Sequence, residues 1–408
     1  MNETTTASIL TQFEPHKPRD RRLQLGLHFA RLMRAGKLHL LLPDGSTHDF
    51  EGSEPGPAAT MVVKDARMVG KLAFGGCLGL AEAYMEGMWD SPHVTDVLAL
   101  GTANEQAWDN MLRGKAWARF ASWLMHNLRP NSRKGSRKNI SEHYDLGNDF
   151  YAEWLDRSMT YSSALFEGGV DDLQAAQAQK YRRLCESLEL KPGMSVLEIG
   201  CGWGGFAEMA AGEFGARVTG ITLSTEQLAY ARQRIARAGL SDKVTLRLQD
   251  YRDTSGTFDR IASIEMFEAV GQAYWPTYFR KVRDLLVPGG RAGLQIITIQ
   301  DQLFDDYARS ADFIQKYIFP GGMLPSEARL RQEIGAAGLS WQSVSRFGLD
   351  YARTLNQWAT RFQGAWKAIE PLGFDERFRR LWLFYLGYCE AGFRTGRTDV
   401  IQLGLAKA

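Results

Sequence analysis

The sequence predicts an α/β fold in which a mostly parallel sheet carries helices on both faces and is joined to a smaller α+β domain. Short apolar runs alternate with helical patterns between residues 195 and 299, and this alternation is typical of βαβ units. The first run, 196–199, breaks at once into glycines at positions 200, 202, 204 and 205. The chain has 408 residues, which is enough for two domains and a large core.

Each element of the large domain follows from its local pattern of apolar residues. The predicted strands are 196–199, 218–221, 244–248, 258–264 and 293–299, and the predicted helices are 172–188, 205–212, 225–238 and 274–286. Further along the chain, we interpret 301–326 as an aromatic cap, 353–394 as one long helical stretch and 400–406 as the last strand.

Ligands in such sheets lie beyond the carboxyl ends of the strands, so the residues after each strand are candidate walls of a pocket. These walls are Gly200–Gly204, Thr222–Gln227, Gln249–Asp250, Glu265–Glu268 and the strand 295–299 itself. The glycine turn alone leaves three interpretations open: a dinucleotide site, an S-adenosylmethionine (SAM) site, and a tight turn without a ligand. A dinucleotide site expects an acidic residue at the end of the second strand, which here ends in Gly220-Ile221-Thr222.

The small α+β domain is predicted over residues 1–128, followed by a basic linker at 129–139 and a catalytic domain at 140–408. Within the small domain, 111–127 interleaves basic and aromatic residues. This pattern fits a helix packed on its own domain or a helix docked on a membrane surface. The linker is interpreted as a solvated segment or as a contact with anionic lipid headgroups.

Composition excludes several classes of protein. Lys plus Arg number 49 and Asp plus Glu number 47, so the balance offers no general case for nucleic-acid binding. No apolar run reaches the ~18 residues of a spanning helix, and the polar N-terminus does not resemble a signal peptide. We therefore expect a cytoplasmic protein whose membrane contact is peripheral. The four cysteines are widely spaced, so we expect them to be reduced and not to bind zinc. All seven histidines lie at or before His143, so the second half of the chain has no histidine base and no histidine-bound metal.

Longer motifs then narrow the choice. Leu197-Glu-Ile-Gly-Cys-Gly-Trp-Gly-Gly205, His143-Tyr-Asp-Leu-Gly-Asn-Asp149, Tyr317-Ile-Phe-Pro320 and the segment 385–402 occur in order. Together they resemble the cyclopropane-fatty-acyl-phospholipid synthases, which are SAM-dependent lipid methyltransferases with a Rossmann-like sheet. The resemblance runs from about Leu78 to the C-terminus.

The resemblance implies a set of residues that bind SAM. Most of this set also lies in the strand-end walls, which were identified independently. The implied SAM-binding residues are Tyr161, Ser162, Gly200, Gly202, Trp203, Thr222, Leu223, Gln227, Gln249 and Asp250.

The resemblance also implies the chemistry. In the family an unactivated alkene attacks the methyl group of SAM, and a bound bicarbonate removes a proton from the resulting carbocation. Aromatic side chains suit such a site because their faces stabilise a cation without supplying a nucleophile. The implied catalytic residues are Glu268, Ile297, Tyr351, Ser163, Gln295 and Cys389.

Two of these positions depart from the family pattern. Ser163 stands where a cysteine is usual and Gln295 stands where a histidine is usual. Serine still donates a hydrogen bond, but glutamine carries no charge and relays no proton. Cys389 matches a cysteine long treated as an active-site residue, but direct transfer needs no nucleophile, so a packing role is equally open.

The resemblance favours a bilayer phospholipid as substrate, because relatives that act on carrier-protein acyl groups usually lack an N-terminal domain. It also implies a homodimer. The product is either a cyclopropane ring or a methyl branch, depending on which proton is lost. Two alternatives stay open: a methyltransferase for the nitrogen or carbon of a soluble small molecule, and a SAM-binding or lipid-binding module without catalysis.

Overall fold

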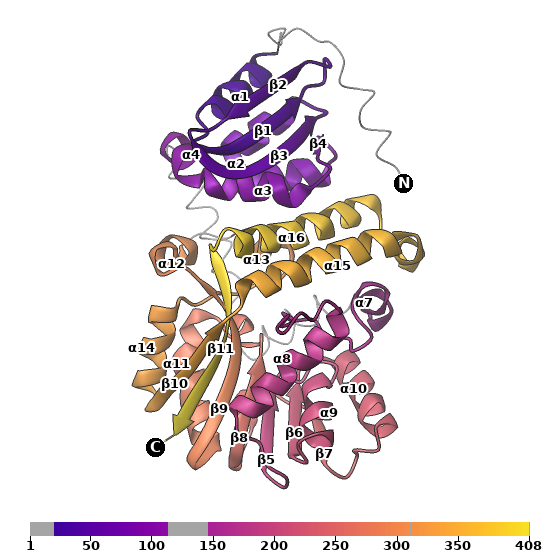
Figure 1. Ribbon diagram of the computed structural model, residues 1–408, viewed down its shortest axis with the longest axis vertical. Coiled ribbons are helices and arrows are strands. Elements are labelled where there is room, and N and C mark those ends of the chain that lie inside the picture. Colours follow the sequence, from indigo (N-terminus) through magenta and orange to yellow (C-terminus); the bar gives the residue numbers. More distant parts are fainter. Residues whose placement is uncertain (1–19, 113–145, 310–311, 408) are drawn as a thin grey trace. The chain divides into compact units, whose positions relative to one another are not determined.

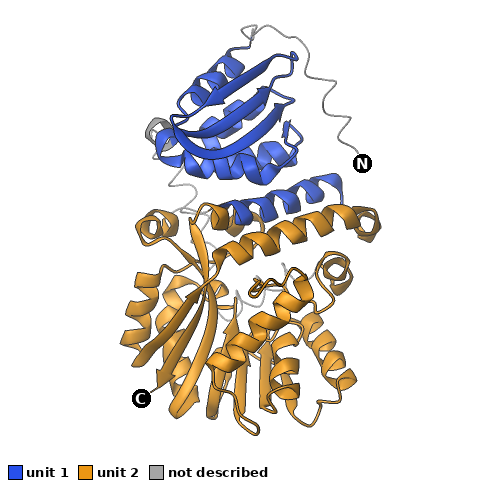
Figure 2. Ribbon diagram, in the orientation of Figure 1, with its two compact units in different colours: residues 1–118, 375–391 blue, residues 119–374, 392–408 orange. Residues whose placement is uncertain are grey.

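The computed structural model describes residues 20–112, 146–309 and 312–407 (Figure 1). The predicted boundary at residue 128, the linker 129–139 and nearly all of the helix 111–127 lie outside the described residues, so these predictions stay untested. The chain divides into two compact units, one of residues 1–118 with 375–391 and one of residues 119–374 with 392–408 (Figure 2). Each unit is described by itself.

The first unit contains a four-stranded sheet with the order β2-β1-β3-β4. Its first two strands form an antiparallel hairpin, and β3 is parallel to β1. The short β4 pairs antiparallel with β3. The strands are β1 (Ala35–Leu41), β2 (Thr47–Glu51), β3 (Glu54–Val63) and β4 (Trp89–Asp90), and the helices are α1 (Arg21–Arg31), α2 (Arg67–Met85), α3 (Val94–Ala103) and α4 (Glu105–Leu112).

Most of the helix α16 (Glu376–Arg394) belongs to the first unit, although the sequence assigns it to the domain 140–408. Arg380 on α16 donates hydrogen bonds to the carbonyl oxygens of Tyr84 and Trp89 and lies 4.1 Å from the centroid of the Tyr84 ring. Thr95 Oγ1 on α3 donates to Glu390 at 3.1 Å. These bonds attach residues 375–391 to the small sheet unit.

The prediction of one helical stretch over 353–394 is wrong at its centre. The structure has α15 (Gly348–Ile369), then a 3₁₀ turn (Glu370–Leu372), then α16. Pro371 lacks the N–H that a continuing helix needs, and Gly373 adopts a left-handed φ of +104°. The segments on both sides are rich in aromatic residues, so the pattern of apolar residues alone does not reveal that the helix ends here.

The second unit contains a seven-stranded sheet with the order β10-β11-β9-β8-β5-β6-β7. Strands β9, β8, β5, β6 and β7 are mutually parallel, whereas β11 and β10 add an antiparallel edge. The mostly parallel sheet is therefore confirmed. Strand β10 was not predicted, because its residues are largely exposed and show no apolar run. The strands are β5 (Ser195–Ile199), β6 (Arg217–Thr222), β7 (Val244–Leu248), β8 (Phe258–Ile264), β9 (Leu286–Ile299), β10 (Leu339–Arg346) and β11 (Thr398–Lys407).

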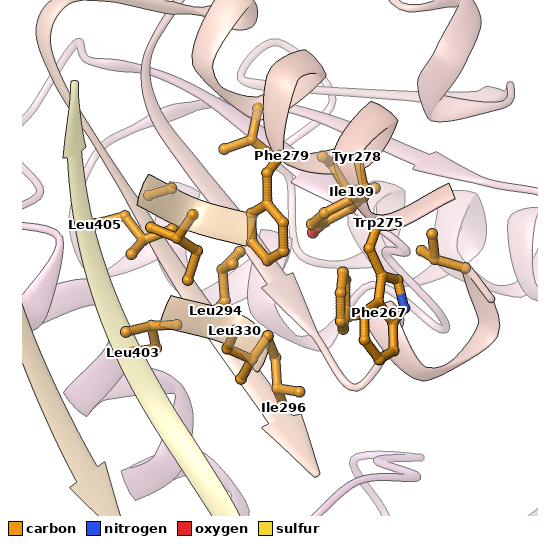
Figure 3. Packing of buried hydrophobic residues seen from close by; sticks show 14 of the residues in the cluster. Ile199, Phe267, Trp275, Tyr278, Phe279, Leu294, Ile296, Leu330, Leu403 and Leu405 are labelled. Carbon is orange, nitrogen blue, oxygen red and sulfur yellow. The ribbon is translucent and has the colours of Figure 1, made fainter. Parts of the chain in front are cut away.

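Helices cover both faces of this sheet, as predicted. Val196 of β5 joins the cluster of α8, α9 and α10, while its neighbour Leu197 joins the cluster of α11 and α14. Figure 3 shows Phe279 of α11 near Leu294 of β9, and Trp275 of the same helix beside Phe267. Burying side chains of this size stabilises the fold by roughly 1.5–3 kcal/mol each, so the strand ends are held by a rigid core. The helices are α8 (Leu173–Ser187), α9 (Gly205–Gly212), α10 (Thr225–Arg237), α11 (Trp275–Leu285) and α14 (Glu327–Ala336).

The remaining described helices of this unit are short. They are α7 (Asn148–Trp154), α12 (Asp301–Ala308) and α13 (Phe313–Tyr317). The last two fall in the segment interpreted as a cap. Across both units, none of the described helices combines the length and the apolarity that a bilayer crossing needs.

Candidate active site

The glycine turn joins β5 to α9. Gly200, Gly202 and Gly204 have φ values of +85°, +51° and +84°, a region that side-chain-bearing residues rarely adopt. A Cβ atom on Gly200 would lie 2.8 Å from Cγ of Met266, so glycine is also required by space. The N–H groups of Gly200 and Cys201 both donate to the carbonyl oxygen of Ile221 on β6, at 2.9 Å. The turn is thus fixed against the next strand.

The ends of β6 and β7 adjoin this turn and are linked to each other. Thr222 Oγ1 donates to Oε1 of Gln227 at 3.1 Å, and Ser224 caps α10 by accepting from the N–H of Gln227. The N–H of Gln249 donates to the carbonyl oxygen of Thr222 at 3.0 Å. Leu223 is half-buried between them. We call the carboxyl ends of β5, β6 and β7 the cofactor edge. Because these strands are parallel, the predicted SAM-binding residues that follow them lie at the same edge of the sheet.

Asp250 is engaged more tightly than the sequence suggests. Its carboxylate accepts from both Nε and Nη2 of Arg252, at 2.9 and 2.7 Å. This hydrogen bonding raises the pKa of Arg252. Arg252 was not among the predicted site residues, and its proximity in sequence to Asp250 was the available signal. A ligand that contacts Asp250 would share it with this guanidinium.

The segment that holds Tyr161 and Ser162 lies against an aromatic cluster. The ring centroid of Tyr161 lies 5.4, 5.6 and 5.3 Å from those of Tyr151, Trp154 and Trp358. Trp203 of the glycine turn lies 5.2 Å from Tyr151, and its Nε1 donates to Oδ1 of Asn148 at 2.7 Å. Two predicted SAM-binding segments, 161–162 and 200–204, therefore share the Tyr151 ring.

A buried lysine holds Ser162 from the other side. Lys180 is fully buried and its Nζ donates to Ser162 Oγ at 2.6 Å, while Gln177 Nε2 donates to the carbonyl oxygen of Ser162 at 2.9 Å. Burial lowers the pKa of Lys180 to about 7, although the charge of Glu265 opposes this. The sequence already indicates that this lysine is buried, because the i, i+3, i+4 spacing places Gln177 and Lys180 on the apolar face of α8.

Three predicted catalytic residues meet at Glu265, which directly follows β8. Oε1 of Glu265 accepts from the Ser163 N–H at 2.8 Å and from Gln295 Nε2 at 2.7 Å. Oε2 accepts from the Tyr351 hydroxyl at 2.6 Å. We call Glu265 with these three donors the Glu265 site. The sequence had marked Glu265 only as a strand-end wall.

The backbone and the environment of Glu265 are both unusual. Its φ is +49°, and in the described part of the chain only Met159 and Glu189 share a positive φ among non-glycine residues. Burial raises the pKa of Glu265, while hydrogen bonding from Tyr351 and the charge of Lys180 lower it in part. Strain and burial at one carboxylate point to function rather than to stability.

The amide of Gln295 is oriented by Gln402. The two residues are direct partners in the β9–β11 pairing, and Gln402 Nε2 donates both to Gln295 Oε1 and to the carbonyl oxygen of Lys180, each at 3.1 Å. Gln295 therefore presents its nitrogen to Glu265. Ser163 differs from expectation, because its hydroxyl donates to the carbonyl oxygen of Ala164 and only its peptide N–H faces Glu265.

Glu268 and Ile297 form a neighbouring pair, as the predicted site requires. The N–H of Ile297 donates to Oε1 of Glu268 at 2.6 Å. Oε2 of Glu268 is buried and has no hydrogen-bond partner among the described residues. Burial, aided by the charge of Glu265, raises the pKa of Glu268 to about 8. Burial therefore favours the protonated form of Glu268.

Two further observations complete the geometry. Cys389 lies half-buried on α16, in the first unit, and is not one of the residues that meet at Glu265, so its predicted role stays untested. In the described part of the chain, no group of three or more His, Cys, Asp or Glu residues is placed to hold a metal ion.

Comparison with known proteins decides between the interpretations. The sequence profile described as "Mycolic acid cyclopropane synthetase" matches residues 131–403. The chain belongs to this family. A tuberculostearic acid methyltransferase of Mycobacterium tuberculosis is 38% identical over 397 residues, which are 92% of this chain and 90% of that protein. A cyclopropane-fatty-acyl-phospholipid synthase of Escherichia coli is 39% identical over 358 residues, covering 87% of this chain and 88% of that protein.

Solved structures agree. A mycolic acid cyclopropane synthase in complex with SAH and CTAB superposes with a TM-score of 0.63 at 32% identity, covering 66% of this family member and 98% of that chain. The family member described here is thus a SAM-dependent methyltransferase that modifies lipids. The dinucleotide interpretation of the glycine turn is set aside, and so are the turn without a ligand and the non-catalytic module.

Proposed function

We propose that the enzyme transfers the methyl group of SAM to the double bond of an unsaturated acyl chain in a membrane phospholipid, through a carbocation. The proposal rests mainly on one observation: the Glu265 site lies directly next in the chain to a residue that packs at the cofactor edge. Met266, whose side chain lies where a Cβ atom on Gly200 would point, directly follows Glu265. A methyl donor at the turn would therefore lie beside a buried base.

The residues of the cofactor edge fit SAM. The positive φ values at Gly200 and Gly202 and the open space beside Gly202 suit a nucleoside ligand, and SAM would supply an electrophilic methyl group there. Tyr161 and Trp203, held by the Tyr151 ring, would line the same place with aromatic faces. These faces stabilise a cation and offer no nucleophile to trap it.

The chemistry follows from the alkene. Its π electrons form a carbon–carbon bond to the methyl group as the carbon–sulfur bond breaks, and a carbocation is left on the acyl chain. Loss of a proton from the new methyl group closes a cyclopropane ring. Loss of a proton from a neighbouring chain carbon leaves a methyl branch beside a double bond. The two relatives named above are of these two kinds by name, so their similarity to this chain does not choose between them.

The predicted bicarbonate site does not fit this chain in the expected form. Tyr351, Gln295 and the peptide N–H of Ser163 already donate to Glu265. A second anion would compete for these donors and would face a like charge. We derive no step through bicarbonate.

The phospholipid substrate, the peripheral membrane contact and the homodimer stay proposals. The support for a phospholipid is that the described first unit accompanies the catalytic unit, as the resemblance to the phospholipid enzymes implies. A cytoplasmic location at the inner membrane face would follow from that substrate.

The test uses SAM with a fully deuterated methyl group, vesicles of cis-unsaturated phospholipid, and mass spectrometry of the fatty acids before and after hydrogenation. A saturated product with two of the three methyl deuterons means ring closure. A methyl-branched product that keeps all three, and that hydrogenation reduces, means that the proton was lost from a chain carbon. Either result supports the proposal. SAM binding without transfer to vesicle lipid contradicts it and favours a soluble small-molecule acceptor.

A further inference from the structure

We propose that Glu265 is the general base of the reaction and takes the place of a bicarbonate ion from solution. This inference rests on the proposed function and deepens it. The three groups that meet at Glu265 are among those the family resemblance assigns to the bound anion, namely Tyr351 and the positions of Ser163 and Gln295.

A carboxylate and a bicarbonate present the same pair of oxygens on a planar carbon. At Glu265 one oxygen accepts two N–H groups at 2.8 and 2.7 Å and the other accepts a hydroxyl at 2.6 Å. An ionised carboxylate has about four acceptor positions. Three are used by the described residues, so one position remains to take a proton.

The position of Glu265 relative to the methyl donor follows from its chain neighbours. Met266 would touch a side chain at Gly200, at 2.8 Å, and Ser163 directly follows Ser162, which Lys180 anchors. Glu265 is thus one residue from a contact with the glycine turn and is bonded to the residue after a predicted SAM ligand. A base at this place would lie beside a methyl donor held at the glycine turn.

The substitution at position 295 fits this role. A histidine at this position would be a second group able to take the proton. The Gln295 amide does not titrate and serves Glu265 only as a hydrogen-bond donor. Gln402 holds the amide in that orientation from the paired strand. Gln295 therefore orients Glu265 through its hydrogen bond and leaves Glu265 as the group that takes the proton.

The step balances without an external reagent. The electron pair of the breaking C–H bond moves to the cationic carbon and forms the ring bond or the double bond, and the proton moves to a carboxylate oxygen of Glu265. Before that transfer, the negative charge of Glu265 stabilises the carbocation. Burial, which raises the pKa of Glu265, makes it a stronger base than an exposed carboxylate. The proton leaves to water after the product departs.

The experiment compares the wild type, Glu265→Gln and Glu265→Gly in buffer freed of carbon dioxide and in buffer with added bicarbonate. Glycine suits the φ of +49°. Glu189 is the matched control, because it is a surface glutamate with a φ of +50°, and Glu189→Gly makes the same backbone change. Calorimetry of the binding of S-adenosylhomocysteine (SAH) and a thermal unfolding curve check that each variant is folded.

We expect the wild-type rate to be the same with and without bicarbonate. Glu265→Gln should lose about 100-fold or more in kcat, the usual contribution of a general base, with SAH affinity unchanged. Glu265→Gly should lose as much, and bicarbonate or formate should restore at least about tenfold by filling the emptied site. Glu189→Gly should keep wild-type activity.

The inference is overturned by wild-type activity that falls on removal of bicarbonate, or by a folded Glu265→Gln variant with near-wild-type kcat. If neither Glu265 variant binds SAH, the wild-type response to bicarbonate decides alone. A wild type that binds SAH but modifies no vesicle lipid overturns the proposed function, and with it the inference.

Discussion

The cofactor edge and the Glu265 site are built from the same sheet in different ways. The cofactor edge comes from consecutive βα turns, with backbone conformation set by glycines such as Gly200. The Glu265 site takes one group from each of four separate segments: residues 163, 265, 295 and 351. The comparison teaches that the predicted cofactor site is built from segments close in sequence, whereas the proposed base is surrounded by groups that only the tertiary structure brings together.

The first prediction breaks the cofactor edge. Gly200→Val places branched carbons where Met266 lies and imposes a left-handed φ on a β-branched residue. We expect the free energy of unfolding to fall by about 3 kcal/mol, and SAH affinity to fall about 100-fold. Gly256→Val is the control, since Gly256 has a φ of +93° with open space around it. Calorimetry that shows equal SAH affinity for both variants would contradict the assignment.

The second prediction sharpens the comparison through pH. The folded protein keeps the proton of Glu268 up to about pH 8, whereas the unfolded chain releases it near 4.5. Wild-type stability from this group is therefore full at low pH and is lost as pH rises through that window. Glu268→Gln removes the loss, so its stability relative to wild type should rise by about 1.4 kcal/mol per pH unit at most.

Urea unfolding at several pH values between 5 and 8 measures this difference. Glu226→Gln is the control, because Glu226 is an exposed carboxylate on α10. A Glu268→Gln curve parallel to that of the wild type across the whole window would show that Glu268 is ionised in the folded protein.

The third prediction weakens the Glu265 site without removing its base. Tyr351→Phe deletes the 2.6 Å hydrogen bond to Glu265 and keeps the ring that stacks on Phe393 at 4.4 Å. Hydrogen bonds to charged groups contribute about 1.5–3 kcal/mol, so kcat should fall roughly 10-fold to 100-fold with SAH affinity unchanged. Tyr230→Phe on α10 serves as the control. Equal losses in kcat and in SAH affinity would place Tyr351 in the cofactor edge instead.

The smallest expected effect tests the link between the glycine turn and α7. Trp203→Phe removes the hydrogen bond to Asn148 and keeps an aromatic ring beside Tyr151. A double-mutant cycle with Asn148→Ala should give a coupling energy of about 1 kcal/mol in SAH binding. A coupling near zero would mean that Asn148 does not orient Trp203 for the ligand.

The contrast between local and tertiary construction also explains what the sequence could predict. The β5–α9 turn, the strands and most helices have local patterns, so their positions and the cofactor edge were predictable from residues such as Gly200 and Thr222. The family resemblance implied that Glu268 and Ile297 lie around one site, and in the structure the N–H of Ile297 donates to Glu268.

The sequence did not predict what depends on contacts between distant segments. Glu265 was visible only as a strand end, because nothing local shows that residues 163, 295 and 351 converge on it. Lys180 lay on an apolar helix face, where its partner Ser162 is 18 residues away. The edge strand β10 has no apolar run because it is exposed along most of its length.

The positive φ of Glu265 has a consequence for how such sites change over generations. Glutamate and glycine codons differ by a single nucleotide, and at this backbone position the change to glycine relieves strain instead of creating it. An ancestral enzyme with glycine here, dependent on a dissolved anion, and a descendant with its own tethered carboxylate would be separated by one mutation. On the proposal that Glu265 is the base, selection for the reaction would act against the conformational preference of the main chain and keep the glutamate in place.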